Sequence, residues 1–458
     1  MTDNTKEFET KSIPSLLWQY ALPSVITQII ASVYNICDRA FLGQYVGASA
    51  IAGLAVTMPV MNIIHAFGSL VGAGAGARMS IVLGKRDISW AENILGNTML
   101  LTFFFGFFFV SGWYIFSDSI LSLFGASDTT ISYAREYMDI VLPGMFLTTL
   151  TFNLTGLIRS TGYASKSMWI MIAGVVVNIL LDLLFICIMD MGISGAAWAT
   201  TISMAFSSVL SITHFVSPRA FIRFRAHGFE PKFYIFRNIL AIGISPFAMN
   251  LAGSGVIALL NSQLIRYGGD MAVAANGVAN SFAPLVVMLI LGICQGMQPI
   301  AGYNYGAGLV SRLREVYILT MKCNVGVGII GSILVITIPR YLAMCFTNDP
   351  ELIGYSVLAL RLILVMSPFI GFTITNSQFF QSIDKPGIAI ITSLSRQVLM
   401  LTPLCLLIPP VFESMGYSGL TGVFSACTIS DIAGAILAAI LLWRNIGVLR
   451  QPDHGVQQ

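Results

Sequence analysis

Long apolar segments separated by short polar breaks run through almost the whole chain. A helix needs about 20 apolar residues to cross the hydrocarbon core of a bilayer, because each residue adds about 1.5 Å of length. The pattern therefore predicts twelve membrane-spanning helices, with ends defined to within a few residues. They cover residues 15–37, 51–77, 93–114, 134–157, 167–189, 193–216, 238–264, 273–300, 317–338, 354–378, 386–410 and 416–443.

The basic residues are distributed unevenly between the two sets of loops. If the N-terminus is cytoplasmic, 18 of the 24 Lys and Arg residues fall in segments on the cytoplasmic side. Arg396 lies within a predicted helix, and the outside segments hold only Arg39, Arg135, Arg266, Arg340 and Arg361. Cytoplasmic loops of membrane proteins carry an excess of Lys and Arg. The distribution therefore predicts that both termini are cytoplasmic.

The two halves of the chain resemble each other at a nearly fixed offset of 222 to 225 residues. Ordered matches carry this repeat: Pro23 with Pro246, Gly84 with Gly306, Pro143 with Pro368, Gly162 with Gly387, and 192–195 with 416–419. Each half holds six helices, an even number, so the halves share one topology as a parallel repeat. The prediction is a bundle at 15–216, a basic linker at 217–237, a second bundle at 238–443, and cytoplasmic tails at 1–14 and 444–458.

Composition agrees with an all-α integral membrane protein. Hydrophobic residues make up 56% of the chain and charged residues 10%, whereas a soluble domain carries about 25% charged residues. The net charge of +3 is too small to indicate a nucleic-acid partner. Parallel repeats in membranes are typical of transporters that work by alternating access, while channels more often build a pore from separate subunits. Transport is therefore the favoured class.

Sequence motifs for other chemistry are missing. The seven Cys residues form no CxxC pair and only four His residues occur, so no metal site is indicated. An enzyme is not expected, because the sequence contains no HExxH, GxSxG or His cluster. The sequence also lacks a GxxxxGK[ST] loop, so neither ATP-driven pumping nor a cofactor is expected. The polar start, with no apolar h-region, predicts a cytoplasmic tail and not a signal peptide.

The first half has two candidate carboxylates: Asp182 lies inside the fifth predicted span, and Asp38 lies near the outer end of the first. An ionisable group within the hydrocarbon costs about 2.5–3.5 kcal/mol. The helical rise puts Asp182 about 22 Å above the inner face and Thr200 about 10 Å below the outer face of a core of about 30 Å. Asn178 lies one turn before Asp182. Oxygens at one depth can coordinate a hard cation or exchange a proton. The alternative is structural: Asp38 pairs with Arg39, and Asp182 bonds a neighbouring helix.

The second half is poorer in acids. Its deep polar residues are Asn250, Asn261, Gln295, Gln298, Gln378, Arg396, Gln397 and Asp431. A guanidinium near mid-membrane must find a carboxylate, helix-end carbonyls or water. Arg396 is expected to anchor the bundle in preference to contacting a substrate. Asp431 is either its partner or a lone carboxylate, and Gln295 and Gln298 line a substrate path or are structural; the sequence leaves these alternatives open.

Five stretches stand out in order along the chain: Asn35–Gly43, Leu157–Gly162, Val177–Asp182, Gly195–Thr200 and Gln295–Gly306. In this order they resemble the MATE (multidrug and toxic compound extrusion) family from about Ser15 to Trp443. The last stretch, together with Arg396-Gln397, is most similar to the bacterial MepA-like branch.

The resemblance implies a V-shaped, twelve-helix antiporter that exports organic, often cationic, compounds and uses an inward Na⁺ or H⁺ gradient. It implies cation-coupling residues at Asp38, Asn178, Asp182 and Thr200. Asn153 joins them, although its estimated depth is nearer the cytoplasm. No metal is implied other than Na⁺ at this cluster. Some MATE branches also carry an acid deep in the seventh or tenth span, where this chain has only amides.

The resemblance also sets the expected surroundings of the protein. The partners implied are a small organic substrate and membrane lipids, with the chain acting as a monomer in the bacterial plasma (inner) membrane. The main alternative function is a flippase for a lipid-linked oligosaccharide. A flippase handling anionic pyrophosphate needs several basic residues along its path, and Arg396 alone is clearly intramembrane, so small-molecule export is favoured. The substrate and the choice between Na⁺ and H⁺ stay open.

Overall fold

The structure is a computed structural model that describes residues 4–41, 48–123, 131–218, 220–450 and 452–453. Side chains at 34–41, 48–53, 55 and 122–123 lie outside the described part. Every regular element in the described residues is helical, as the pattern of apolar segments predicts.

The first bundle begins after a short helical segment. A 3₁₀ turn (Asn4–Lys6) and the one-turn helix α1 (Glu7–Thr10) come before the first long helix. The bundle contains α2 (Ile13–Phe41), α3 (Ala48–Gly84), α4 (Ile88–Leu123), α5 (Ile131–Ser160), α6 (Ala164–Asp182) with its π-helical continuation η3 (Leu183–Ile188), and α7 (Gly192–Val216).

The second bundle follows a linker that contains the 3₁₀ turn η4 (Ala226–Phe229). Its elements are α8 (Phe233–Gly306), α9 (Val310–Thr337), α10 (Pro339–Met344), α11 (Pro350–Leu364), α12 (Ser367–Ser382), α13 (Pro386–Leu394), the π-helix η5 (Ser395–Leu401), α14 (Thr402–Ser414) and α15 (Gly419–Arg444), with a final 3₁₀ turn η6 (Ile446–Leu449).

The helix α8 is two membrane spans joined without a loop. Its 74 residues would extend about 110 Å as a straight helix, far beyond a core of about 30 Å. Gly269 breaks the helix with φ 61° and ψ −160°, a backbone conformation that glycine adopts without steric cost. The sequence predicts two spans here, with a loop at 265–272. The structure keeps the two spans and replaces the loop by this single glycine.

The number of spans agrees with the prediction of twelve. Ten helices of the described residues are long and apolar enough to cross a membrane, and the bent pair α11 and α12 makes an eleventh span. Dividing α8 at Gly269 gives the twelfth. The span predicted at 354–378 is present as this bent pair: the chain turns by 40° between α11 and α12, where Pro368 lies in the first turn of α12 and lacks a backbone donor.

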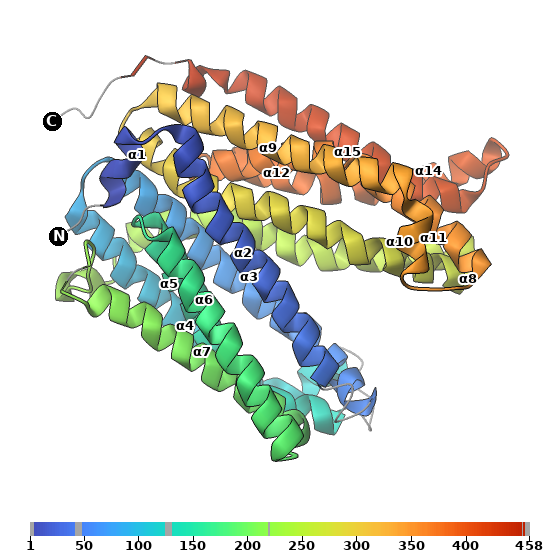
Figure 1. The fold of residues 1–458 in the computed structure, drawn as a ribbon, viewed down its shortest axis with the longest axis horizontal. Helices are drawn as coiled ribbons and strands as arrows, with labels where there is room; N and C mark the ends of the chain where they lie inside the picture. Colours follow the sequence, from blue (N-terminus) through green and yellow to red (C-terminus); the bar gives the residue numbers. More distant parts are fainter. Residues whose placement is uncertain (1–3, 42–47, 124–130, 219, 451, 454–458) are drawn as a thin grey trace.

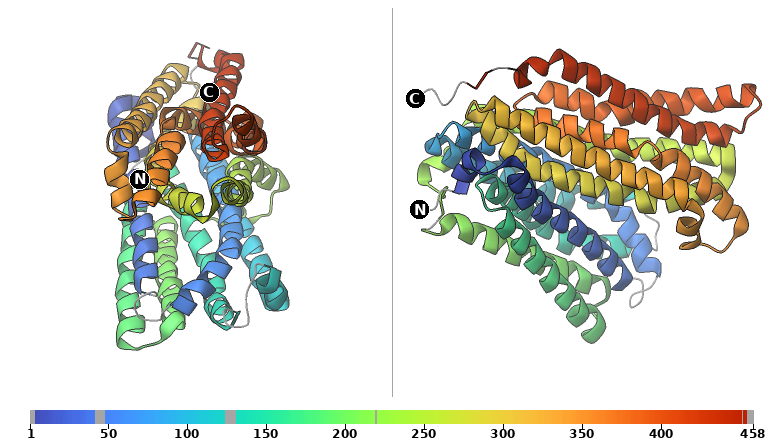
Figure 2. Two further views of the ribbon diagram at one scale, coloured as in Figure 1. Left: turned by 90° about the vertical axis from the view of Figure 1, so that its right-hand side faces the viewer. Right: turned by 45° about the horizontal axis from the view of Figure 1, so that its top comes forward.

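The two bundles form a V. Figures 1 and 2 show that α2 to α7 make one arm and α8 to α15 the other. The arms converge at the end of the molecule where both termini lie and diverge toward the opposite end (Figure 1).

The arms meet along a seam in which glycines bring backbones together. A Cβ atom built on Gly74 of α3 would overlap the carbonyl oxygen of Ile239, and one on Gly243 of α8 would overlap the carbonyl oxygen of Leu70. Two contacts further along the seam are related by the sequence repeat. Gly84 packs on Tyr303, and Gly306 packs on Ile81, at positions 222 residues apart. The repeat is therefore also a local two-fold relation in space.

We expect Gly74→Ala to separate α3 from α8 and to destabilise the fold. The new methyl group has no room against a backbone carbonyl, which cannot rotate away as a side chain could, and overpacking of this kind costs about 1–3 kcal/mol. The measurement is the midpoint of thermal unfolding of the purified protein in detergent. Gly255→Ala, on α8 where a Cβ meets nothing within 4 Å, is the matched control. Equal midpoints for the two variants would contradict the seam assignment.

Candidate cation-coupling site

The predicted cluster of the first bundle lies on the helical hairpin α6–α7. Gly174 of α6 packs against Ser207 of α7, and this contact fixes the register of the two antiparallel helices. Asp182 comes eight residues after Gly174, so it lies level with Ala199, beside Thr200. The structure therefore brings Asp182 and Thr200 to one level of the bundle.

All three hairpin residues are buried. The exposed fraction is 0% for Asn178 and Asp182 and 7% for Thr200. Neither polar atom of the Asn178 amide makes a hydrogen bond within the described part of the chain. A buried amide without partners is rare, because desolvation costs about 1–3 kcal/mol, and it commonly marks the place of a water or an ion. The amide, hydroxyl and carboxylate oxygens are the donor types that hard cations prefer.

Asp182 is also the last α-helical residue before a π-helical turn. The hydrogen-bond pattern changes at Leu183, where η3 begins. Such π-helical turns are rare in proteins and frequently occur at functional sites. The equivalent span of the second bundle has the same feature, since Arg396 lies in η5. Each bundle thus has a π-helical segment at or beside an ionisable side chain, which is fully buried for Asp182 and 25% exposed for Arg396.

Asp38 and Asn153 are the remaining predicted members of the cation-coupling cluster. The side chain of Asp38 lies outside the described residues. Its helix α2 packs against α6, which carries Asp182. Asn153 is fully buried, but its contacts are with other helices: its amide donates to Thr102 Oγ1 at 2.9 Å and its oxygen lies against Gly72.

Asn153 also lies at a different depth from Thr200. On the same helix α5, Thr151 bonds Ser208 of α7 at 2.8 Å, so Asn153 comes level with about Leu210. That is ten residues, or about 15 Å, from Thr200 toward the end with the termini. This placement agrees with the depth that the sequence predicts for Asn153.

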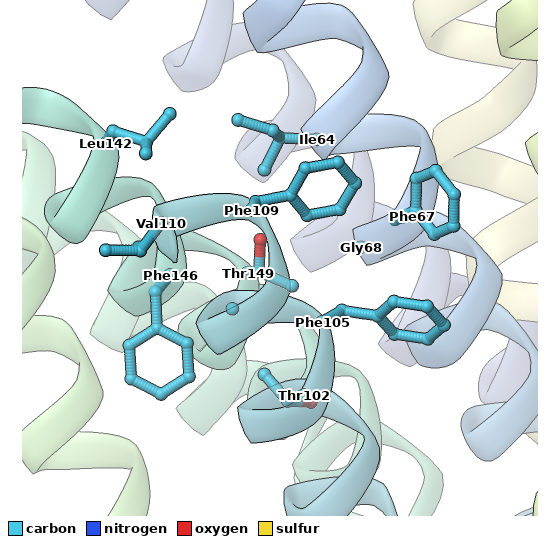
Figure 3. A pocket seen from close by; sticks show the side chains of 11 residues that line it. Ile64, Phe67, Gly68, Thr102, Phe105, Phe109, Val110, Leu142, Phe146 and Thr149 are labelled. Carbon is cyan, nitrogen blue, oxygen red and sulfur yellow. The ribbon is translucent and has the colours of Figure 1, made fainter. Parts of the chain in front are cut away.

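A small apolar cavity lies beside the Asn153–Thr102 hydrogen bond. Figure 3 shows its lining from α3, α4 and α5, with four phenylalanine rings and two threonine hydroxyl groups: Phe67, Phe105, Phe109, Phe146, Thr102 and Thr149. Its volume of about 20 Å³ is far below the roughly 300–1,000 Å³ of sites that bind drug-sized ligands. In this conformation the cavity is too small for an organic drug.

In the second bundle, the open question about Asp431 is answered. Arg396 donates from Nη1 to Asp431 Oδ1 at 3.2 Å, and the carboxylate side chain is 3% exposed. Asp431 is therefore the partner of Arg396. Gly434, on the same helix α15, packs against the backbone of Arg396, which supports the role of this pair in joining two helices. The charge of each residue is compensated within the bundle.

The two predicted glutamines lie in the seam between the arms. Gln295 accepts a hydrogen bond from Arg159 of α5 at 3.2 Å, and Gln298 donates to the carbonyl oxygen of Ala73 at 3.5 Å. Sequence reasoning placed Arg159 in a cytoplasmic segment and missed this role across the seam. It also missed a buried hydrogen bond, 2.8 Å long, from the Asn324 amide to Thr375 in the second bundle. Spacing along the helices was the only feature of the sequence that could have indicated the Arg159–Gln295 and Asn324–Thr375 hydrogen bonds.

These observations define a class: a multi-pass helical membrane protein made of two repeated six-helix bundles, each with ionisable groups in its interior. The MatE family model matches the chain twice, over residues 23–184 and 246–407. The matches fall one in each bundle, start 223 residues apart, and together cover more than half of the sequence. The chain therefore belongs to the MATE family of membrane transporters.

Individual relatives cover nearly the full length. "Multidrug export protein MepA" of Staphylococcus aureus (strain MSSA476) is 26% identical over 439 residues, 95% of each chain. The MepA protein of Staphylococcus saprophyticus is 24% identical over 438 residues, also 95% of each chain. A solved structure described as the outward-facing conformation of a multidrug resistance MATE family transporter of the MOP superfamily has a TM-score of 0.90 at 24% identity, covering 99% of this chain and 100% of that one. It shows the shared fold.

We expect Arg396→Met to destabilise the protein by about 3–5 kcal/mol, because it leaves the Asp431 carboxylate buried without its cation. The double variant Arg396→Met, Asp431→Leu should recover most of this loss, since it removes both charges. Thermal unfolding of the purified proteins in detergent measures the effect, with Arg314→Met at an exposed position of α9 as the control. A double variant no more stable than the single one would show that the pair is not the reason for the loss.

Proposed function

We propose that this chain is an antiporter that exports organic, chiefly cationic, compounds and is driven by an inward gradient of Na⁺ or H⁺. The observation that carries the proposal is the buried group of Asp182, Asn178 and Thr200 inside the first bundle of a MATE-family chain. The relatives with near full-length matches are multidrug export proteins by name, which supports drug-like substrates.

A buried carboxylate can couple an ion gradient to a conformational change. In a low-dielectric interior the negative charge must be neutralised by a proton or balanced by a bound cation. The neutral oxygens of Asn178 and Thr200 could complete the shell of Na⁺ around Asp182, and Asp38 could add a second charge. Two nearby carboxylates would also share a proton, so the same cluster suits either ion.

The closed seam supports alternating access between the arms. The glycine contacts between α3 and α8 are packed backbone surfaces with few side chains to interlock. If the termini are cytoplasmic, as the excess of Lys and Arg predicts, the seam closes the inner side and this conformation faces outward. A cysteine introduced at Arg223 and labelled by an impermeant reagent only after the cells are opened checks this orientation in the plasma membrane.

The flippase alternative is disfavoured by the charges of the second bundle. A lipid-linked pyrophosphate needs basic groups that are free to bind it. Arg396, the intramembrane cation that the sequence offered for this role, is held by Asp431.

Export of organic cations is the first test. Cells that make the protein should accumulate less ethidium than cells with an empty vector. The difference should disappear when the Na⁺ and H⁺ gradients are collapsed, because the gradient supplies the free energy for export. Dye fluorescence in cells and in everted vesicles measures this. If a lipid-linked sugar is translocated while a broad panel of organic cations is not exported, the flippase alternative is correct.

The role of Asp182 is the sharper test. Asp182→Asn keeps the shape and removes the charge, so gradient-driven export should fall to the empty-vector level while the protein remains folded in the membrane. Thr200→Ala should raise the half-saturating ion concentration about three- to tenfold, as expected for the loss of one neutral ligand. Asp190→Asn, on the exposed loop between η3 and α7, is the matched control. Native rates and ion dependence in Asp182→Asn would place the coupling site elsewhere.

A further inference from the structure

The N-terminal helix α1 lies across the seam and contacts both arms. The ring of Phe8 is fully buried between Tyr20 of α2 and Tyr303 of α8, with both ring centroids 5.2 Å away. Tyr20 belongs to the first arm and Tyr303 to the second. An aromatic side chain is therefore inserted between the two arms at the end where they converge.

The next residue, Glu9, makes polar contacts with both arms. Its carboxylate accepts hydrogen bonds from Tyr303 at 2.7 Å and from Arg86, between α3 and α4, at 3.2 Å. Tyr303 and Arg86 belong to different arms, so one carboxylate bridges them. Opening the seam moves these two donors apart, and the carboxylate cannot follow both.

The second arm also holds the backbone of this segment. Arg312 of α9 donates to the carbonyl oxygens of Phe8 at 3.0 Å and of Lys11 at 2.5 Å. Asn304 of α8 donates to the Phe8 carbonyl at 3.4 Å. These carbonyls belong to a helix of one turn, which has no internal partners for them. The segment is covalently part of the first arm and is bound to the second.

The linker between the two arms makes the arrangement that corresponds to this one in the sequence repeat. The turn η4 precedes α8, the first helix of the second arm, and docks on α4, the third helix of the first arm. There the buried Asn97 donates to the carbonyl oxygens of Gly228 and Glu230, both at 3.0 Å, and accepts from the Lys232 amide at 2.9 Å. In the same way, α1 precedes the first span of its own arm and binds α9, the third span of the other arm, as well as the end of α8.

From this relation we infer that α1 is the non-covalent counterpart of the linker: a latch that holds the arms together at the seam and must release one of them for the seam to open. The linker remains attached to both arms through the chain itself, whereas α1 crosses by contacts that can break. The inference rests on the proposed alternation between two conformations. It assigns to the segment 7–11 control over the balance between them.

The test is the distance between the arms at the end of the molecule with the termini. Spin labels are placed at Ser165→Cys of α6 and Arg314→Cys of α9, both exposed, in a chain freed of other reactive cysteines and reconstituted in lipid nanodiscs. Phe8→Ala should raise the population with widely separated labels at least about tenfold, because the latch loses its buried ring. Glu9→Gln should raise it about threefold, as expected for a partly exposed ion pair.

Thr10→Ala is the matched control, because Thr10 is exposed and its hydroxyl bonds only to Lys6 within the same segment. It should leave the distance distribution unchanged. Unchanged distributions in both Phe8→Ala and Glu9→Gln would overturn the latch, and Glu9→Gln keeps the test decisive if Phe8→Ala does not fold. The distances are measured without drug or ion gradient. A failed export assay together with a shifted distribution therefore rejects the substrate proposal alone.

Discussion

The close approach of α3 and α8 backbones is the constraint on which the arrangement of the two arms depends. In a bilayer, helices gain little from burying apolar side chains against each other, because lipid tails are equally apolar. Association relies instead on van der Waals contact, and small residues allow the closest approach. Gly74 and Gly243 provide this at one level of the seam, and Gly84 and Gly306 at another. These close contacts help to hold the arms together at the end of the V where they converge.

The two arms differ in the surroundings of their buried carboxylates. In the second arm, the charge of Asp431 is compensated internally by Arg396 at 3.2 Å. In the first, the fully buried Asp182 lies one turn from an amide with no hydrogen-bond partner in the described residues. The Arg396 side chain therefore compensates the Asp431 charge within its own arm, while the coupling role that we propose for Asp182 draws on the buried amide and hydroxyl oxygens beside it.

The repeat extends beyond the spans to the short segments that precede each arm. Both α1 and the turn η4 bind the third span of the opposite arm, through Arg312 in one case and Asn97 in the other. Each arm is thus tied to the other by the short segment that precedes it. The repeat is therefore expressed in the attachments between the arms as well as in the bundles themselves.

The sequence alone determined the membrane class, the twelve spans and the repeat, because these depend on the length and order of apolar segments. It also determined the shared level of Asp182 and Thr200, since depth follows from the fixed helical rise. It could not place side chains around a helix relative to its neighbours. The tertiary structure decided three points: Asp431 pairs with Arg396, Gln295 belongs to the seam, and Phe8 lies between the two arms. Each depends on contacts between helices far apart in the chain, which no local pattern of residues specifies.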